Sequence, residues 1–245
     1  MPDMIVGRNP VMEALRSGAR QIETILIVKD NEHPRLRQVI DAAERKGIPY
    51  QRCLRHHLDK LHPNHQGVIA QISGFQYTTL PTLLENVRKK ENTPAVLIML
   101  DQIQDPRNLG AIIRTANAIN ADGVLIPKNN SVDITASVHK AAAGSTEYTP
   151  ITKVTNLAQT IEKLKGNGIW IVGTDEDAEM SYTSADFTVP LCIVLGNEGD
   201  GIRRLVKQKC DYLVHLPMLG KIQTLNVSVT TGVLLYEVLR QRSAK

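Results

Sequence analysis

The rear of the chain consists of short apolar runs that alternate with stretches of helical periodicity. The runs lie at residues 95–100, 123–126, 169–172, 191–195 and 212–216. Each run is as long as a β-strand and is apolar at nearly every position, which is typical of strands buried on both faces. Buried strands separated by helices form a parallel sheet covered on both sides. The pattern therefore predicts an α/β domain over residues 94–245.

The front of the chain predicts a smaller unit of mixed elements. We expect helices at residues 10–15 and 34–46 and strands at residues 24–28 and 67–72. A unit of about 70 residues is near the lower limit for a domain that folds alone. The pattern places a first domain at residues 1–74, followed at residues 75–93 by a polar linker with room for one helix.

Composition narrows the classes of function. Of the 245 residues, 42% are hydrophobic and 22% are charged, which is ordinary for a globular protein. The longest apolar runs are too short to span a bilayer, and the first residues lack a basic and then apolar leader. We therefore expect a cytoplasmic location and no membrane partner. Cys53, Cys192 and Cys210 lack CxxC spacing, so we expect neither a metal site nor a disulfide framework.

Positive charge is concentrated in the first part of the chain. Residues 1–93 hold 14 Lys and Arg against 10 Asp and Glu, whereas residues 94–245 hold 15 of each, and five of the seven histidines also lie in the first part. A cationic module joined to a neutral one suggests a polyanionic partner. A basic surface that is merely solvated is the alternative. With two Phe and one Trp, recognition of nucleic acid mainly by stacking is disfavoured.

The first polar motif, Asp101-Gln-Ile-Gln-Asp-Pro-Arg-Asn-Leu-Gly110, follows the first apolar run. Asp105 is the expected N-cap of a helix that has proline at its first position. The apolar face of this helix is formed by Leu109, Ile112, Ile113 and Ala116. Asn108 and Arg114 lie on other faces, near the carboxyl end of a strand where ligands of open α/β sheets bind. A surface arginine and a capping asparagine would explain both residues without a ligand.

The second motif, Gly196-Asn-Glu-Gly-Asp-Gly201, follows the fourth apolar run. Its three glycines allow the backbone to approach a ligand closely and to turn sharply into a helix. The GxxGxG order differs from the dinucleotide fingerprint, which disfavours a Rossmann dehydrogenase, and a P-loop would need Lys and Ser or Thr. A tight surface turn is the alternative, with Glu198 between glycines.

The third motif combines a turn at residues 217–220 with Thr224-Leu-Asn226 at the start of a helix that ends near Arg242. A helix N-cap explains Thr224 or Asn226. Capping does not explain both residues together with the turn that precedes them.

Together the three motifs resemble those of the SpoU (TrmH) family of RNA ribose 2′-O-methyltransferases, within the SPOUT superfamily. The resemblance covers residues 95–240, with the motifs in the family's order. The front module is similar to the L30e-like RNA-binding domain of some members through Gly7-Arg-Asn-Pro-Val-Met-Glu-Ala-Leu15 and His65-Gln-Gly-Val68. The resemblance implies a SPOUT α/β domain with a deep trefoil knot, and a homodimer with active sites near the subunit interface.

The resemblance also implies S-adenosyl-L-methionine as the cofactor and ribosomal RNA as the partner. The implied catalytic residues are Arg114, Asn108, Glu198, Asn226 and Thr224. The implied cofactor contacts are Gly196, Leu216, Leu225, Leu195, Met218 and, more weakly, Thr174. Position 224 is usually serine in the family, and threonine keeps the hydroxyl while adding a methyl group. Candidate RNA contacts are Arg8, Arg107, Arg52, Arg55 and His65, each of which is also compatible with an ordinary surface charge or, for His65, a turn cap.

The difficult part of the expected reaction is activation of the nucleophile, because a ribose 2′-hydroxyl is a weak acid. A guanidinium with a pKa above about 12 is a poor base, so we expect Arg114 to stabilise developing alkoxide charge. We expect Glu198 and Asn226 to position the substrate, with a link from Asn226 to Asn108. The first expectation is methylation of a guanosine ribose in 23S ribosomal RNA. The alternatives are a transfer RNA or another ribosomal nucleotide, and a non-catalytic RNA-binding assembly factor.

Overall fold

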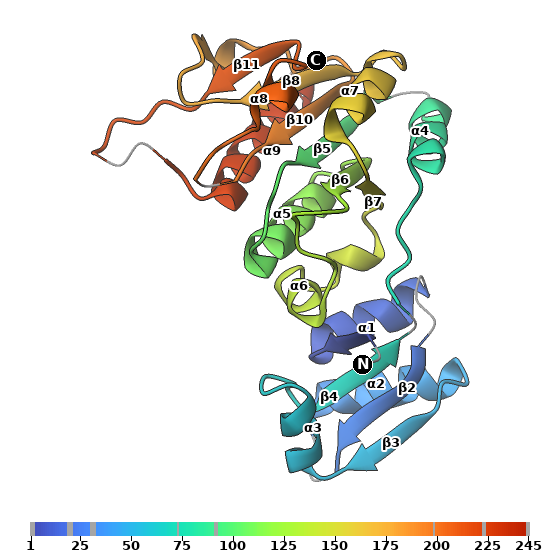
Figure 1. Ribbon diagram of the computed structural model, residues 1–245. Helices are drawn as coiled ribbons and strands as arrows, with labels where there is room; N and C mark the ends of the chain where they lie inside the picture. Colours follow the sequence, from blue (N-terminus) through green and yellow to red (C-terminus); the bar gives the residue numbers. More distant parts are fainter. Residues whose placement is uncertain are drawn as a thin grey trace. The chain divides into compact units, whose positions relative to one another are not determined.

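The computed structural model describes residues 3–18, 22–29, 33–72, 74–90, 93–197, 199–221 and 224–243. The chain forms two compact units (Figure 1). Unit 1 contains residues 1–76 and 133–148, and unit 2 contains residues 77–132 and 149–245. Unit 1 is therefore discontinuous in sequence. No helix in the described ranges is long and apolar enough to cross a membrane.

Unit 1 is built around a four-stranded sheet in the order β1-β4-β2-β3. Its elements are β1 (Asp3–Val6), α1 (Arg8–Ser17), β2 (Ile22–Val28), α2 (Pro34–Arg45), β3 (Tyr50–Cys53), α3 (Arg55–Leu61), β4 (Val68–Ile72), α6 (Ala136–Ala141) and the 3-10 turn η1 (Ser145–Glu147). β4 is antiparallel to β1 and β2, and β2 is parallel to β3. The four elements predicted from the sequence are confirmed as α1, α2, β2 and β4.

Alternating residues of the unit 1 strands enter two separate cores. Ile5, Ile25 and Ile27 pack with the apolar faces of α1 and α2. Val6, Leu26 and Ile69, which have the opposite parity, pack with Leu58 of α3 and Ala136 of α6. Because successive strand residues point to opposite faces, both faces of this sheet are covered.

Residues 133–148 are an integral part of unit 1. The Tyr148 hydroxyl donates a hydrogen bond of 2.6 Å to Glu13 Oε2 on α1, which raises the pKa of the tyrosine to about 12. Gly144 has a φ of 98°, and a Cβ there would lie 2.7 Å from Glu13 Cβ. Glycine is therefore needed at this position both for the backbone conformation and for the close approach to α1.

Unit 2 contains a seven-stranded parallel sheet in the order β7-β6-β5-β10-β8-β11-β9. Its elements are α4 (Leu80–Lys89), β5 (Val96–Leu100), α5 (Pro106–Ala118), β6 (Gly123–Pro127), β7 (Ile151–Val154), α7 (Leu157–Lys165), β8 (Trp170–Thr174), β9 (Met180–Ser181), the 3-10 turn η2 (Tyr182–Ser184), β10 (Leu191–Leu195), α8 (Arg204–Lys207), β11 (Tyr212–His215) and α9 (Val227–Ser243). The five apolar runs correspond to β5, β6, β8, β10 and β11. The predicted α/β fold with a parallel sheet is confirmed.

Helices cover the sheet of unit 2. Leu83 of α4, Ile161 of α7 and Val206 of α8 pack on one set of strand residues, which includes Leu97 and Val194. Strand residues of the other parity, such as Ile98 and Ile193, are equally buried, as expected for a sheet that is covered on both faces. α5 and α9 contact each other.

Hydrogen bonds at two helix ends show how single side chains fix where these helices begin and end. The Asp105 side chain accepts a hydrogen bond of 2.8 Å from Arg107 N, which confirms the predicted N-cap of α5. At the end of α9, the Arg242 guanidinium donates to the carbonyls of Phe187 (2.9 Å) and Val189 (2.8 Å) ahead of β10. It also donates to the Ala95 carbonyl just before β5 (3.3 Å). The end of α9 is thereby held against the starts of two central strands.

Candidate active site

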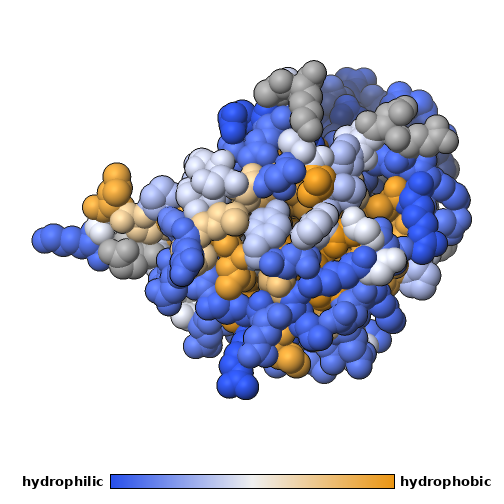
Figure 2. Space-filling view, turned by 90° about the horizontal axis from the view of Figure 1, so that it is seen from above, coloured by the Kyte–Doolittle hydropathy of each residue, from blue (hydrophilic) through white to orange (hydrophobic). Residues whose placement is uncertain are grey.

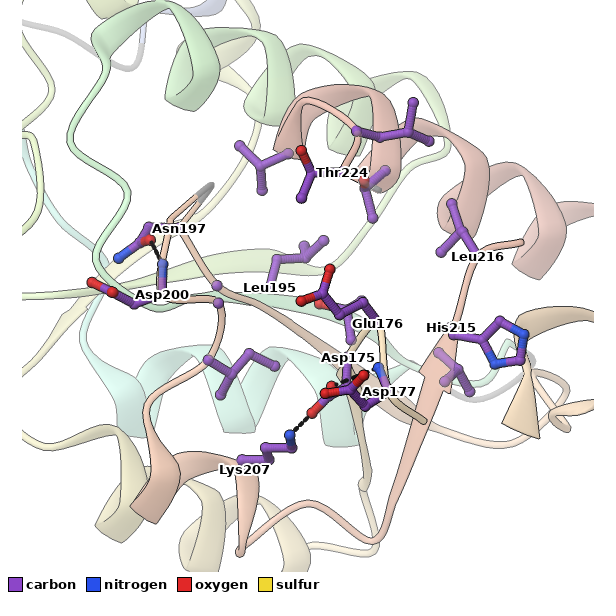
Figure 3. A pocket seen from close by; sticks show the side chains of 18 of the residues that line it. Asp175, Glu176, Asp177, Leu195, Asn197, Asp200, Lys207, His215, Leu216 and Thr224 are labelled. Atoms are coloured by element: carbon purple, nitrogen blue, oxygen red, sulfur yellow. Dashed lines mark hydrogen bonds and ion pairs between the residues drawn. The ribbon is translucent and has the colours of Figure 1, made fainter. Parts of the chain in front are cut away.

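A pocket lies where the carboxyl ends of β8, β10 and β11 meet in unit 2 (Figure 3). These strands are parallel neighbours, so their carboxyl ends reach the same edge of the sheet. The cavity has a volume of about 300 Å³. Its walls come from the strand ends, from the glycine turn at residues 196–202, from the segment between β11 and α9, and from the first turn of α9. Figure 2 shows that the part of the chain that follows β11 projects from the surface of unit 2.

The glycine turn closes on itself at Gly196. A Cβ at this residue would lie 1.9 Å from the carbonyl carbon of Gly201 and 2.3 Å from the nitrogen of Ile202. Asn197 Oδ1 accepts hydrogen bonds from the backbone nitrogens of Gly199 (2.8 Å) and Asp200 (2.7 Å). Glycine is therefore required at position 196, because the backbone of Gly201 and Ile202 occupies the space that a side chain would need.

A buried carboxylate fixes the end of this turn. Asp101 directly follows β5 and its side chain is fully buried. It accepts hydrogen bonds from Arg203 N (2.9 Å) and from Arg203 Nε (2.8 Å). The backbone nitrogen of Asp101 donates to Leu195 O on β10. The Asp101–Arg203 pair therefore ties the exit of the glycine turn to the central strands.

One wall of the pocket is acidic. Asp175, Glu176 and Asp177 follow Thr174 at the end of β8. Asp175 forms an ion pair with Lys207 of α8. Figure 3 shows the Glu176 carboxylate directed into the hollow between Leu195 and Leu216. The pocket thus combines apolar walls with negative charge.

The expected link between Asn226 and Asn108 is confirmed. Asn226 Nδ2 donates a hydrogen bond of 2.9 Å to Asn108 Oδ1, which joins the start of α9 to the first turn of α5. Asn226 Oδ1 accepts from Ser228 N at 3.0 Å, so Asn226 also caps α9. The two roles belong to one side chain, since its amide and its carbonyl have different partners.

The structure brings most of the expected site residues together. The pocket is lined by all six expected cofactor residues and by one expected catalytic residue: Thr174, Leu195, Gly196, Leu216, Met218, Leu225 and Thr224. Asn108 joins this group through Asn226. Arg114 is exposed on α5 and is not one of the described lining residues. Glu198 lies outside the described residues.

Sequence reasoning missed several polar residues of the pocket region, namely Asp101, Asp175, Glu176, Asp177, Asn197 and Lys207. Asp101 and Asp175 each follow a buried strand directly. The rule that ligands bind at carboxyl ends of parallel strands could have found both. Lys207 gave no such signal, because it lies on α8 rather than at a strand end, and only the fold brings it to the pocket beside Asp175.

The candidate RNA contacts are divided between the units. Arg8, Arg55 and His65 line a second cavity, in unit 1. Arg52 is exposed on β3, and Arg107 is exposed on α5 in unit 2. Within the described ranges, no cluster of His, Cys, Asp and Glu is placed to hold a metal ion.

The fold and the pocket define a protein with a parallel α/β sheet and a cavity at the carboxyl edge of that sheet, walled by a glycine turn and the start of a helix. Residues 95–236 match the SpoU rRNA methylase family, and residues 4–78 match the RNA 2′-O ribose methyltransferase substrate-binding domain. The chain belongs to the SpoU family of RNA methyltransferases, whose methyl donor is S-adenosylmethionine.

Similar proteins match over nearly the whole chain. YacO of Bacillus subtilis (strain 168), assigned to the TrmH family of tRNA/rRNA methyltransferases, is 43% identical over 98% of this chain and 96% of its own length. The 23S rRNA (guanosine-2′-O-)-methyltransferase RlmB of Pseudomonas putida is 39% identical over 99% of this chain and 98% of its own length. The crystal structure of an AdoMet-bound rRNA methyltransferase from Sinorhizobium meliloti superposes with a TM-score of 0.81, at 25% identity, over 97% of this chain and 87% of that chain.

Proposed function

We propose that this chain transfers the methyl group of S-adenosylmethionine to the 2′-hydroxyl of a guanosine ribose in 23S ribosomal RNA. The observation that carries the proposal is the convergence of all six expected cofactor residues on one pocket beside the Asn108–Asn226 hydrogen bond. The 39% identity to RlmB over nearly the full length supports the choice of substrate.

The residues of the pocket fit the cofactor. Close approach of a ligand to the backbone is possible at Gly201, where a Cβ would have no atom within 4 Å. Leu195, Leu216 and Leu225 offer apolar surface for the adenine ring. Glu176 places negative charge toward a ligand that is cationic at sulfur. When bound, S-adenosylmethionine supplies an activated methyl group on a positively charged sulfur atom.

The catalytic residues act on the RNA hydroxyl rather than on the cofactor. Positioning of two large substrates for in-line attack is worth on the order of 7–11 kcal/mol. Asn226 and Asn108 hold the starts of α9 and α5 in one arrangement beside the pocket. Arg114 provides a permanent cation that stabilises charge developing on the ribose oxygen. Glu198 and Thr224 complete the proposed set as positioning residues.

The position of Arg114 outside the pocket fits a homodimer whose active sites lie near the subunit interface. Exposed apolar residues gather along α9 and the segment before it: Leu219 is 100% exposed, Leu225 40%, Val229 50%, Tyr236 55% and Leu239 42%. Exposed apolar side chains on one helix and the segment before it are the composition expected of an interaction surface. We expect a dimer in light scattering, and Tyr236→Glu should shift it toward monomer. A wild-type chain that is monomeric at all concentrations would contradict the dimer.

Four further features belong to the same proposal. They are the deep trefoil knot in the SPOUT domain, the cytoplasmic location, RNA contact by the front domain, and the boundaries at residues 1–74, 75–93 and 94–245. Two segments depart from these boundaries, since residues 133–148 pack in unit 1 and α4 packs in unit 2. The substrate-binding match at residues 4–78 supports RNA contact by the front domain.

A transfer RNA substrate is the second candidate, because YacO is assigned to a family of tRNA and rRNA methyltransferases. The test is transfer of a labelled methyl group by the purified chain to 23S ribosomal RNA and to transfer RNA, followed by mapping of the methylated ribose. We expect labelling of one guanosine in 23S RNA. Labelling of transfer RNA alone would show that transfer RNA, and not ribosomal RNA, is the substrate. Cofactor binding without transfer to any RNA would favour the assembly factor.

Arg114→Lys sharpens this test. The substitution keeps the charge but removes the planar guanidinium. Because Arg114 is exposed, we expect the fold and cofactor binding to be retained and the rate of transfer to fall by about tenfold or more. Full activity of Arg114→Lys would refute a specific role of the guanidinium.

A further inference from the structure

A second cavity, of about 260 Å³, lies in unit 1. It is lined by Arg8, Val28, His33, Arg55, His65, Gln66 and Gly67. These residues come from the start of α1, the end of β2, the residue before α2, the start of α3 and the turn before β4. The two motifs that mark the front module in the sequence, which begin at Gly7 and His65, therefore meet in one place.

The backbone around this cavity is held by bonds within unit 1. Gly7 N donates to Val68 O at 3.2 Å, and Arg8 N donates to Gln66 Oε1 at 3.3 Å. Gly7 and Gln66 both have positive φ values, of 101° and 54°. The start of α1 and the turn before β4 are thus fixed to each other, and the cavity does not depend on a ligand for its shape.

Both ring nitrogens of His65 form hydrogen bonds within unit 1. It is 2% exposed, and its Nδ1 accepts a hydrogen bond of 2.8 Å from Gly67 N. Its Nε2 therefore carries the proton and donates to Asp59 Oδ1 at 2.9 Å. Both ring nitrogens are used, so the candidate RNA contact at His65 becomes a residue that shapes the cavity.

The remaining polar side chains of the cavity favour an anion. Arg8 and Arg55 each carry a permanent positive charge, and His33 stands at the N-cap of α2. Among the described lining residues there is no carboxylate. Guanidinium groups match phosphate oxygens in pairs, and α1 directs the positive end of its dipole toward Arg8 at its first position.

The geometry points to a pocket for one phosphate of an RNA backbone, bound by Arg8 and Arg55 in the cavity shaped by His65. This inference rests on the proposed function, because RNA is the source of that phosphate. The pocket belongs to unit 1, whereas the proposed active site belongs to unit 2, so its part is to hold the substrate on the enzyme. Its residues are therefore expected to control RNA affinity rather than the methyl-transfer step.

The test measures binding of a short fluorescent single-stranded RNA to the intact chain by anisotropy, over a range of salt concentrations. The variant is Arg8→Gln with Arg55→Gln. Arg45→Gln with Arg37→Gln, on α2, is the matched control with the same change in net charge and no residue in the cavity. Loss of a paired guanidinium–phosphate contact should weaken binding by about tenfold or more. The slope of log affinity against log salt should fall by roughly 0.7 for the phosphate lost.

The outcomes separate this inference from the proposed function. Weaker binding and a smaller salt slope in the cavity variant, with the control close to wild type, support the pocket. Equal losses in the cavity variant and the control overturn it, since net charge alone would then explain binding. Binding of inorganic phosphate that depends on Arg8 and Arg55, without any effect of the variant on RNA binding, also overturns it in favour of a free phosphate site.

Methylation assays supply the second readout. If the pocket binds substrate, the variant should raise the KM for RNA while the rate at saturating RNA is retained. A lower rate at saturating RNA with unchanged KM contradicts the inference. If the wild-type chain binds RNA through this cavity but transfers no methyl group, the proposed function fails and the pocket stands.

Discussion

Replacement of Gly196 by alanine tests whether the glycine turn is the structural basis of the proposed cofactor site. The added Cβ would lie 1.9 Å from the carbonyl carbon of Gly201 and 2.1 Å from its oxygen. Ordinary contacts between such atoms are near 3.5 Å, so backbone must move by about 1.5 Å. Both contacts are with main chain, which cannot swing aside as a side chain can.

The size of the effect follows from what this movement would break. Residues 201 and 202 lead directly to Arg203, whose two hydrogen bonds reach the buried Asp101 carboxylate at 2.8 and 2.9 Å. Hydrogen bonds to charged groups contribute about 1.5–3 kcal/mol each. Loss of both would lower the free energy of unfolding by about 3–6 kcal/mol. Disruption of the same turn should weaken binding of S-adenosylmethionine by at least about tenfold.

The measurements are urea unfolding followed by circular dichroism, and titration calorimetry with S-adenosylmethionine. Gly199→Ala is the control in the same turn, because a Cβ there would meet only the side-chain oxygen of Asn197, at 3.5 Å. We expect Gly199→Ala to stay within about 0.5 kcal/mol of wild type. The reasoning is wrong if Gly196→Ala unfolds at the wild-type urea concentration and binds the cofactor with wild-type affinity.

Three further predictions concern the packing of unit 2. Asp101→Asn should lower the free energy of unfolding by about 1.5–3 kcal/mol, because the buried oxygen facing Arg203 loses its charge; unchanged urea unfolding would show that the Asp101–Arg203 pair is dispensable. Arg242→Met should cost about 2–4 kcal/mol by leaving the Phe187 and Val189 carbonyls without this donor, and an equal midpoint in thermal unfolding would contradict it. Burial raises the pKa of the Cys192 thiol and raises that of Cys210 to about 12, so at pH 9.0, the ordinary value, both stay protonated in the folded state. Reaction of Cys192 and Cys210 with a thiol reagent at that pH should therefore be slow until urea is added. The free energy of unfolding should also fall as the pH rises from 9.0 toward 12, because the unfolded state loses these protons first. Rapid labelling of all three cysteines without urea would refute this.

Hydrophobic periodicity was enough to predict the parallel sheet, because β5, β6, β8, β10 and β11 are buried on both faces. The periodicity failed for β7, Ile151-Thr-Lys-Val154, where two polar residues interrupt the apolar pattern. Thr152 is nevertheless fully buried there. β9 has two residues and exists only through its pairing with β11, so no local pattern could indicate it.

Some residues of the candidate site could also be predicted from local sequence motifs, whereas others depend on contacts between distant parts of the chain. Gly196, Leu216 and Thr224 were found from motifs that keep their order along the chain. The Asp101–Arg203 pair joins residues 102 positions apart, and spacing along the sequence does not predict such a contact. The Asn108–Asn226 link spans 118 positions, and was expected only from the resemblance to a known family.

Because unit 1 is built from two separate segments of the chain, it cannot be exchanged between relatives as a single segment. Residues 133–148 supply Ala136 to a core formed by Val6, Leu26 and Ile69, although they are encoded between two strands of the other unit. A chimera that grafts residues 1–76 of a relative onto this chain would place a foreign sheet against a native α6. Successful exchange of RNA specificity between relatives would therefore require both segments to be transplanted together.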